Sequence, residues 1–308
     1  MNKKIRKRYM RKKRILVTGG EGFIGKHLVN RLKEMGHDVI TMDLTPGADY
    51  EMDMCEIRNF EHIPDVDVIY HLAAQSFGRG SLMNPQRDLD WNAKGTLNVC
   101  LFAKDRREHV KKIIYTSTMA VYGDRDLAKE TDEVNPLSGY ACSKLYGEHC
   151  VRRFREYGID HTIFRVFNTY GPGQDLSNPY KGIVNAFIQQ VKRGNKINVT
   201  GPLERYRDLT YVDDMVGALL VGLQDDVVNE TINACTSTKT TIKELIDTVI
   251  ETVHSTHGVP KDKFTIENVG GHAGDSFGST GCNDKLIALG WEPTVSLVEG
   301  IDKLWRSI

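Results

Sequence analysis

The stretch RILVTGGEGFIGKHL (residues 14–28) decides the fold class, because a strand, a glycine turn and a helix follow one another in it without a gap. RILVT (14–18) is rich in β-forming residues, and glycines come directly after it. The helix continues to Met35 with apolar residues at helical spacing, and Gly36 predicts its end. A second β-rich run, HDVITMD (37–43), follows. This order of elements predicts two parallel strands joined by a helix.

The same alternation of strands and helices runs through the first half of the chain. Apolar runs at 65–73, 110–117 and 160–168 each have about the length of one buried strand, and residues 84–107 have the pattern of a long helix. This alternation predicts an α/β fold, in which a doubly wound parallel sheet of the Rossmann type carries helices on both faces. Beyond residue 168 the alternation becomes irregular, which predicts a smaller C-terminal α/β lobe, called here the second lobe.

This change of pattern sets the expected domain boundaries. We expect the Rossmann domain at 14–167, with a return segment at about 208–226, and a second lobe made mainly of 168–207 and 227–308. Residues 1–13 form a basic tail: the first 14 residues hold nine Lys or Arg and no acid, although the whole chain has a net charge of zero. A disordered tail is the simplest interpretation, and an arm that binds a polyanion is the alternative.

Composition argues against several classes of protein. Hydrophobic residues make up 40% of the 308, enough for a sizeable core. No apolar run approaches the roughly 20 residues that cross a bilayer, and the basic start lacks the apolar segment of a secretory signal. Six scattered cysteines without a CxxC pair are typical of reduced thiols. We therefore expect a cytoplasmic protein without a membrane or nucleic-acid partner. His254 and His257 have no cysteine or acid beside them, so we expect a solvated helix end there and no metal site.

The glycine turn predicts a dinucleotide site. Gly19, Gly22 and Gly25 permit a tight turn and close approach of the backbone to a pyrophosphate, to which the helix N-terminus presents free N–H groups. Asp43 ends the second strand, where a carboxylate can accept hydrogen bonds from both ribose hydroxyls of an adenosine. Because this carboxylate would repel a 2′-phosphate, we expect NAD rather than NADP; a simple turn residue is the alternative. Asp53 could approach the adenine edge or be a surface acid.

A hydroxyl, a phenol and an amine form the candidate catalytic group. Tyr140 and Lys144 are four apart on a predicted helix, so both project from one face. An ammonium beside a phenol favours the phenolate, and a nicotinamide cation would favour it further. Thr118 lies just past the predicted strand at 110–117, at the carboxyl edge where ligands of such sheets bind. This trio could move a proton on a sugar or alcohol; a buried tyrosine beside a Ser/Thr-rich turn is the alternative.

Eight motifs occur in the order seen in one enzyme family. They are TGGEGFIG (18–25), DMCE (53–56), HLAAQ (71–75), NAKGTLN (92–98), TSTMAVYG (116–123), YACSK (140–144), RVFNTYGPG (165–173) and RYRDLTYVDD (205–214). Through them the chain resembles the extended short-chain dehydrogenase/reductases, and among these the NAD-dependent nucleotide-sugar epimerase/dehydratase family, with UDP-glucose 4-epimerase-like members. The resemblance covers nearly everything from residue 14 to the C-terminus.

The resemblance implies a role for each matched residue. Thr118 would bind the sugar hydroxyl, Tyr140 would act as base, and Lys144 would hold the nicotinamide ribose and tune Tyr140. Asn168 and Arg207 match positions that hold the nucleotide diphosphate, which places substrate binding in the second lobe. The positions implied to bind NAD are Gly19, Gly22, Phe23, Ile24, Gly25, Asp43, Asp53, Met54, Leu72, Ala73, Ala74, Asn92, Thr116, Tyr140 and Lys144. Similar proteins form homodimers through helices equivalent to 85–107 and 138–157.

Two departures from the family pattern narrow the expected chemistry. Relatives that eliminate water carry Asp-Glu after the Thr118 position, and relatives that decarboxylate sugar acids commonly carry Glu where this chain has Ala120. Here Met119 and Ala120 can neither donate nor accept a proton. Relatives also often place a phosphate-binding arginine where GHAGDSFGSTG (271–281) has Phe277 and Gly278.

These observations lead to one functional hypothesis and two alternatives. We expect an NAD-dependent isomerase of carbohydrate biosynthesis, a nucleoside-diphosphate-sugar 4-epimerase that acts through a transient 4-keto sugar. A dehydratase or reductase of the same family is the first alternative. The second is a non-catalytic NAD-binding regulatory module, against which the intact trio argues.

Overall fold

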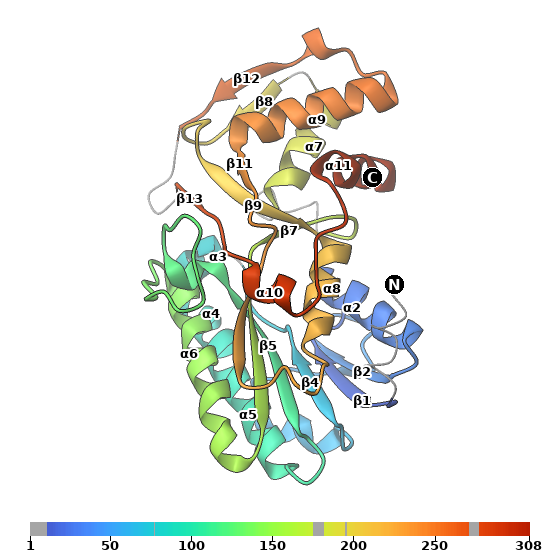
Figure 1. The fold of residues 1–308 in the computed structure, drawn as a ribbon, viewed down its shortest axis with the longest axis vertical. Coiled ribbons are helices and arrows are strands. Elements are labelled where there is room, and N and C mark those ends of the chain that lie inside the picture. The colour runs from blue at the N-terminus through green and yellow to red at the C-terminus, as the bar shows by residue number, and fades with distance from the viewer. Residues whose placement is uncertain (1–10, 77, 175–181, 195, 271–276) are drawn as a thin grey trace.

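The computed structural model describes residues 11–76, 78–174, 182–194, 196–270 and 277–308 (Figure 1). The expected disordered tail lies outside the described residues, except for its last members. Among these, Lys13 donates its backbone N–H to Nδ1 of His37 at 3.3 Å, and its ammonium pairs with Asp225 at 3.2 Å. The structure therefore places Lys13 with the fold rather than with the tail.

A seven-stranded sheet forms the lower part of the molecule in Figure 1. Its strands, all parallel, run in the order β10 (Glu230–Ala234), β6 (Asp160–Val166), β5 (Lys112–Thr118), β4 (Val68–His71), β1 (Arg14–Thr18), β2 (Asp38–Asp43) and β3 (Tyr50–Glu51). The chain thus winds outward from β1 in both directions. This arrangement confirms the predicted doubly wound fold.

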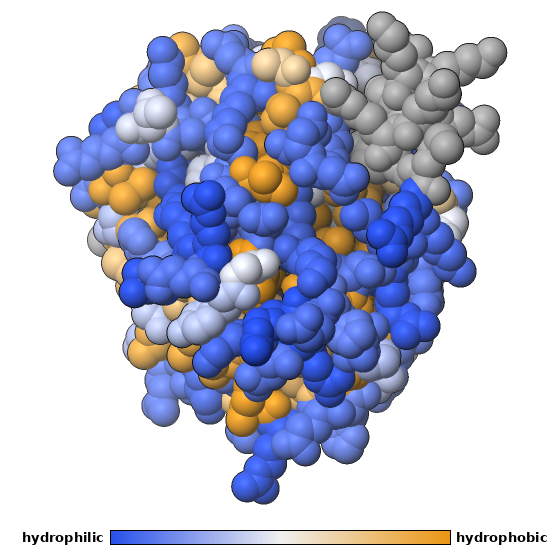
Figure 2. All heavy atoms as spheres, turned by 60° about the horizontal axis from the view of Figure 1, so that its bottom comes forward, coloured by the Kyte–Doolittle hydropathy of each residue, from blue (hydrophilic) through white to orange (hydrophobic). Residues whose placement is uncertain are grey.

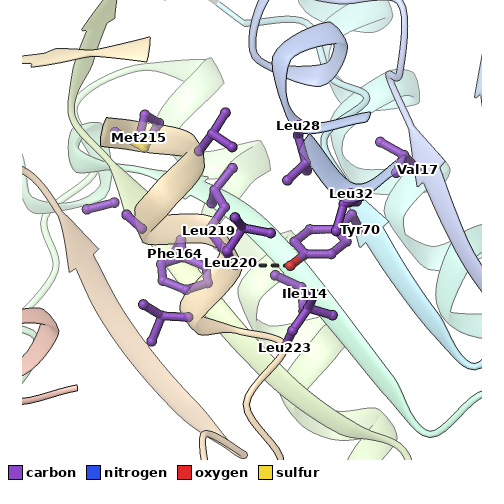
Figure 3. Close-up of a cluster of buried hydrophobic side chains, with 14 of the residues drawn as sticks. Val17, Leu28, Leu32, Tyr70, Ile114, Phe164, Met215, Leu219, Leu220 and Leu223 are labelled. Carbon is purple, nitrogen blue, oxygen red and sulfur yellow. Dashed lines mark hydrogen bonds between the residues drawn. The ribbon is translucent and has the colours of Figure 1, made fainter. Parts of the chain in front are cut away.

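Alternate residues of each strand supply two separate cores. Ile15 and Val17 of β1 pack with α2 (Phe23–Glu34) and α8 (Val212–Val221) on one face. Leu16 belongs to the core of the other face, with η1 (Ile57–His62), α5 (Gly95–Asp105) and α6 (Gly139–Arg153). Helix α4 (Pro85–Leu89) precedes α5 in the chain. Figure 3 shows the first core, in which the Tyr70 hydroxyl donates to the Leu219 carbonyl of α8 at 3.1 Å. Because side chains alternate along a strand, one apolar run can bury both of its faces.

The long helix predicted at 84–107 contains a change of pitch. Between α4 and α5, η2 (Asp90–Lys94) is a turn of π-helix. Such turns insert one extra residue and often occur at functional sites. The insertion rotates the residues on either side of it relative to a regular helix, which the apolar spacing alone did not predict.

The second lobe stands above the carboxyl ends of the main sheet in Figure 1. It contains β7 (Asn168–Tyr170), β8 (Lys196–Val199), β9 (Tyr206–Tyr211), β11 (Lys239–Thr241), β12 (Thr265–Asn268), β13 (Gly278–Ser279), α7 (Ile183–Arg193), α9 (Ile242–His257) and α11 (Leu297–Ser307). Strand β9 pairs with β7, β11 and β13, while β8 pairs with β12. Short helical segments also occur at α3 (Gly78–Met83), η3 (Met119–Tyr122), η4 (Phe154–Tyr157), η5 (Lys261–Lys263) and α10 (Asp284–Ala288).

One part of the expected domain division needs correction. We placed 227–308 mainly in the second lobe, yet β10 adds to the main sheet as the parallel neighbour of β6. Ile232 and Ala234 of β10 are fully buried in the core beneath α8. The return segment therefore extends through residue 234, because the edge of β6 still needs a hydrogen-bonding partner.

The second of two acids at the start of α8 attaches the C-terminal segment to this helix. Asp214 is 5% exposed, and its carboxylate accepts hydrogen bonds from the N–H and hydroxyl of Thr294 and from the N–H of Val295. Its neighbour Asp213 faces solvent, 3.7 Å from His27. Neither side chain caps the helix, whose N-cap is Tyr211.

No helix within the described ranges combines the length and the apolar character that a membrane span needs. The face shown in Figure 2 is mainly hydrophilic, with apolar side chains in small separate groups.

Candidate active site

The main sheet changes its winding direction between β1 and β4. From β1 the chain proceeds to β2 on one side, whereas β4, β5 and β6 extend the sheet on the other. Loops that follow β1 and β4 therefore diverge, and ligands of open α/β sheets bind at such a point. The glycine turn follows β1, Asp43 ends β2 and Thr118 ends β5, so all three lie at the carboxyl edge of the sheet.

The glycine turn is packed too closely to admit side chains. Gly19 has φ +74°, and a Cβ there would lie 2.6 Å from the backbone nitrogen of Ala73. A Cβ on Gly25 would lie 2.0 Å from the Gly19 carbonyl oxygen. Helix α2 begins at Phe23, and its N-cap Gly22 has no side chain to occupy the free N–H groups. The turn therefore fits a dinucleotide, whose pyrophosphate needs close backbone approach and a helix N-terminus.

Asp43 lies next to this turn, as the sequence predicts. Its carboxylate accepts hydrogen bonds from the backbone N–H groups of Glu21 and Thr45, both at 3.0 Å. These two bonds orient the side chain and leave it half-exposed. Asp53 is also half-exposed and accepts a hydrogen bond from the Cys55 N–H at 2.9 Å. Both carboxylates could thus reach the adenosine end of a dinucleotide.

The remaining expected cofactor residues surround the ends of β1, β4 and β5. The N–H of Ala73 donates to the Thr18 carbonyl at 3.0 Å, which holds the segment from Leu72 to Ala74 against the glycine turn. The Thr116 hydroxyl donates to the His71 carbonyl at 3.1 Å. Four other members lie on helices or beside them: Phe23 and Ile24 in the first turn of α2, Met54 against Gly95 of α5, and Asn92 in the π-turn.

Asn92 joins two helices through a fully buried polar network. Its amide N–H group donates to the Gln75 carbonyl, to Asp88 and to Ser143, each at 3.1 Å. Its amide oxygen accepts from the Gln75 N–H at 2.8 Å, and Ser143 donates to Asp88 at 2.7 Å. Ser143 lies between Tyr140 and Lys144 on α6. The network therefore fixes α6 relative to the π-turn.

The catalytic trio is assembled from β5 and α6. Thr118 is the last residue of β5, and its hydroxyl accepts a hydrogen bond from the Ala120 N–H at 3.2 Å. The Thr118 side chain lies close enough to Tyr140 to lower the pKa of the phenol. The Lys144 side chain is 2% exposed, and its Nζ lies 4.3 Å from the centroid of the Tyr115 ring. A hydroxyl, a phenol and an amine thus meet at one end of the sheet.

Burial has the largest effect on the pKa values of Tyr140 and Lys144. It raises the pKa of Tyr140 to about 12, although the hydrogen bond with Thr118 acts in the opposite direction. Burial also lowers the pKa of Lys144 to about 7, against the effects of Glu148 and Asp88. We expected the pKa of Tyr140 to be lowered, and the residues of the chain by themselves do the reverse, because desolvation disfavours a phenolate.

The two residues after Thr118 continue into η3. Met119 and Ala120 are both half-buried there, immediately after Thr118. Their side chains bring no acid or base to this position.

Asn168 and Arg207 lie on neighbouring strands of the second lobe. Asn168 of β7 is in register with Leu209, two residues from Arg207, so both side chains share one face of the sheet. The buried Asn168 Oδ1 has no hydrogen-bond partner among the described residues. Ser279 is in register with Arg207, and its hydroxyl is likewise buried and unpaired in the described part of the chain. This face therefore offers polar groups to a ligand.

Phe277 occupies the position where the family resemblance led us to expect an arginine. Its ring is 50% exposed and meets Tyr206 edge-on, with 6.0 Å between centroids. Arg207 donates to the Phe277 carbonyl at 3.3 Å. The rest of this motif, residues 271–276, lies outside the described residues.

The described residues hold no group of three or more His, Cys, Asp and Glu arranged for a metal ion. We expected His254 and His257 to lie at a solvated helix end, and this is only partly the case. His257 hydrogen-bonds Asp302 at 2.9 Å and lies against Trp305, whereas His254 contacts the Val259 carbonyl. The two histidines thus join α9 to its neighbours.

Comparison with known proteins agrees with this geometry. Residues 15–235, more than half of the chain, match the NAD dependent epimerase/dehydratase family. The chain belongs to this family. Its cofactor is NAD, in agreement with the fit of the glycine turn to a dinucleotide. The predicted family, fold class and cofactor are therefore confirmed.

Members of the family similar to this chain have different activities. A UDP-glucose 4-epimerase from Thermotoga maritima, solved with UDP-glucose, is 32% identical, with a TM-score of 0.86 over 96% of this chain and 98% of its own. UDP-glucose 4-epimerase of Mycolicibacterium smegmatis is 31% identical over 94% of this chain and 96% of its own. UDP-glucuronic acid decarboxylase 6 of Arabidopsis thaliana is 32% identical over 94% of this chain and 86% of its own. Family membership therefore does not select the reaction.

Sequence reasoning missed several buried polar residues of this epimerase/dehydratase family site. Asp88, Ser143 and Glu148 were not singled out, nor was His71, whose ring bridges the hydroxyls of Thr18 and Thr96 at 2.7 and 2.9 Å. A signal existed for Ser143 and Glu148, since both lie on the helix of Tyr140 within one turn of Lys144. Nothing in the sequence indicated that Asp88 would be a partner of Ser143.

Proposed function

We propose that the chain is an NAD-dependent nucleoside-diphosphate-sugar 4-epimerase. One observation carries the proposal: Thr118 lies beside Tyr140, one helical turn from Lys144, whereas Met119 and Ala120 have no group that can donate or accept a proton. Chemistry at one carbinol is thus supported, and elimination or decarboxylation lacks its usual acid and base. General acid–base groups supply about 10² to 10⁴ in rate, so those reactions should be slower here by that order.

The residues of the trio would share the work at C4 of the sugar. Thr118 would hold the C4 hydroxyl, and Tyr140 would take its proton as hydride leaves the same carbon, giving a 4-keto sugar. NAD, when bound, supplies the hydride acceptor, and its oxidised ring brings the positive charge that a phenolate needs. Lys144 would add a second positive charge when protonated. After the sugar presents its opposite face, the hydride would return to C4 and Tyr140 would return the proton to the C4 oxygen.

The second lobe would hold the nucleotide diphosphate. The unpaired Asn168 oxygen can accept a hydrogen bond from a ligand, and Arg207 can pair with a phosphate. The similarity to structures and relatives that act on UDP-sugars supports a substrate of this class. A homodimer through α5 and α6 is part of the same proposal.

The test is product analysis with a panel of UDP-, dTDP-, GDP- and CDP-sugars. A productive substrate should return as an isomer of equal mass, inverted at C4 by NMR, without consumption of added NAD. In D₂O the product should carry no deuterium at C4, because the hydride leaves and returns without exchange with water. A product that has lost water or carbon dioxide would contradict the epimerase proposal and favour another enzyme of the family. Absence of turnover with every sugar in the panel would favour a non-catalytic binding module.

A further inference from the structure

Helix α6 carries a row of functional side chains on the face toward the main sheet. Tyr140, Lys144, Glu148 and Arg152 follow one another at intervals of four, which places consecutive members about 5–6 Å apart at Cβ. Glu148 is fully buried, one turn beyond Lys144. The reaction proposed above gives this carboxylate no role.

The Glu148 carboxylate is held by three side chains. One oxygen accepts from Ser117 at 2.6 Å and from Nε of Arg165 at 3.0 Å. The other accepts from Nη2 of Arg165 at 2.9 Å and from Arg152 at 2.8 Å. A carboxylate has about four acceptor sites, so all are filled. Burial acts to raise the pKa of Glu148, but the hydrogen bonds and charge of Arg165 hold it below its usual value.

This carboxylate connects the two elements of the active site. Ser117 directly precedes Thr118 on β5, and its register partner on β6 is Arg165. Arg152 continues to β10, where it donates to the Thr231 hydroxyl at 2.9 Å. Glu148 therefore binds α6 to β5 and β6, one residue from Thr118.

Lys144 lies among few charged groups. Glu148 faces it from α6 and Asp88 from α4, while the Tyr115 ring on β5 lies beneath its ammonium. His71 on β4 stays neutral near it, because burial lowers the pKa of this ring to about 3. Tyr140 precedes it by one turn. Two carboxylates are thus the anions that oppose its desolvation.

We propose that Glu148 is a positioning residue that serves as the buried counter-ion of Lys144 and holds its helix against the strand of Thr118. Arg165 and Arg152 keep the Glu148 carboxylate ionised and fixed in place. Its negative charge therefore stabilises the protonated form of Lys144 throughout the pH range in which Lys144 titrates. The inference rests on the proposed role of Lys144, but its test needs no sugar substrate.

The test is an NMR titration of Lys144 in NAD-saturated protein labelled with ¹³C,¹⁵N-lysine. The Lys144 signal is assigned by its loss in Lys144→Arg. Replacing Glu148 by Gln keeps the shape and removes the charge, so the protonation midpoint of Lys144 should fall by about one pH unit or more. An unchanged or raised midpoint would overturn the proposal, whatever substrate the enzyme takes.

A matched control and a second variant complete the experiment. Glu156→Gln removes an exposed acid two turns farther along, after the end of α6, and should leave the Lys144 midpoint unchanged. If Glu148→Gln does not fold because Arg165 loses its anion, the double variant with Arg165→Gln removes that buried cation too. The midpoint should then fall by less than in the single variant, because the carboxylate one turn from Lys144 is removed together with an opposite charge. A midpoint above that of the parent in the double variant would contradict the proposal. Once a substrate is known, Glu148→Gln should lose activity at a lower pH than the parent as pH rises.

Discussion

Replacing Asp214 by Ala would test the contact that attaches the C-terminal segment to α8. The substitution removes a buried carboxylate that accepts three hydrogen bonds at 2.7 to 3.0 Å from Thr294 and Val295. Hydrogen bonds to charged groups contribute about 1.5–3 kcal/mol each, and water would reach these partly buried donors in the variant. We expect the free energy of unfolding to fall by about 3–5 kcal/mol, which lowers the melting temperature by roughly 5–12 °C.

The adjacent acid provides a matched control. Asp213→Ala removes the same chemical group from an exposed position, where the nearest charge is His27 at 3.7 Å, so the change should stay within about 0.5 kcal/mol. Both variants are to be compared by urea unfolding and thermal scanning at one protein concentration. Equal effects of the two substitutions, or a loss below about 1 kcal/mol for Asp214→Ala, would refute the reasoning.

Four further outcomes are expected. Tyr140→Phe should abolish turnover and leave NAD bound, because one hydroxyl is lost from an unchanged ring; retained turnover would exclude Tyr140 as the base. Lys144→Met should raise the melting temperature most below pH 7 and less as the pH increases. Burial lowers the pKa of Lys144 from 10.5 to about 7, so below pH 7 the folded state holds a buried ammonium, and above pH 7 it loses this proton before the unfolded state does. A gain independent of pH would contradict this. Calorimetry should show much tighter binding of NAD than of NADP, and Asp43→Asn should narrow the difference; equal affinities in the parent would remove Asp43 from its role. Deleting residues 2–10 should leave turnover and melting temperature nearly unchanged, and a large loss of either would make the tail structural.

Local sequence was enough where neighbours in the chain are also neighbours in space. The strand, glycine turn and helix at 14–34 form in the predicted order, since the spacing of apolar residues and the glycines act over a few positions. The same holds for Tyr140 and Lys144, whose separation by four on α6 places them on one face. Asp43 could be placed because a strand of known length ends there.

Contacts between distant segments were not predictable in this way. Strand β10 resembles any short β-rich run, and its membership of the main sheet depends on the free edge of β6. The π-turn at 90–94 follows a regular apolar pattern, and its buried Asn92 is satisfied by groups from α6 and from Gln75, in the loop after β4. The spacing of apolar residues shows which face of a helix or strand is buried, but not which other segment packs against that face.

The sequence by itself therefore determined the family, the doubly wound sheet, the cofactor and the candidate trio, because each depends on local spacing and on motifs in order. The tertiary structure decided the environment of these groups. It showed that burial raises the pKa of Tyr140 and lowers that of Lys144. It also showed that Glu148 is hydrogen-bonded to Arg165, which is 17 positions away in the chain. It also separated Asp214 from Asp213, two identical neighbours of which one is sealed beneath the C-terminal segment. The physical reason is that desolvation and hydrogen-bond partners arise from packing, which brings together residues that the linear order keeps apart.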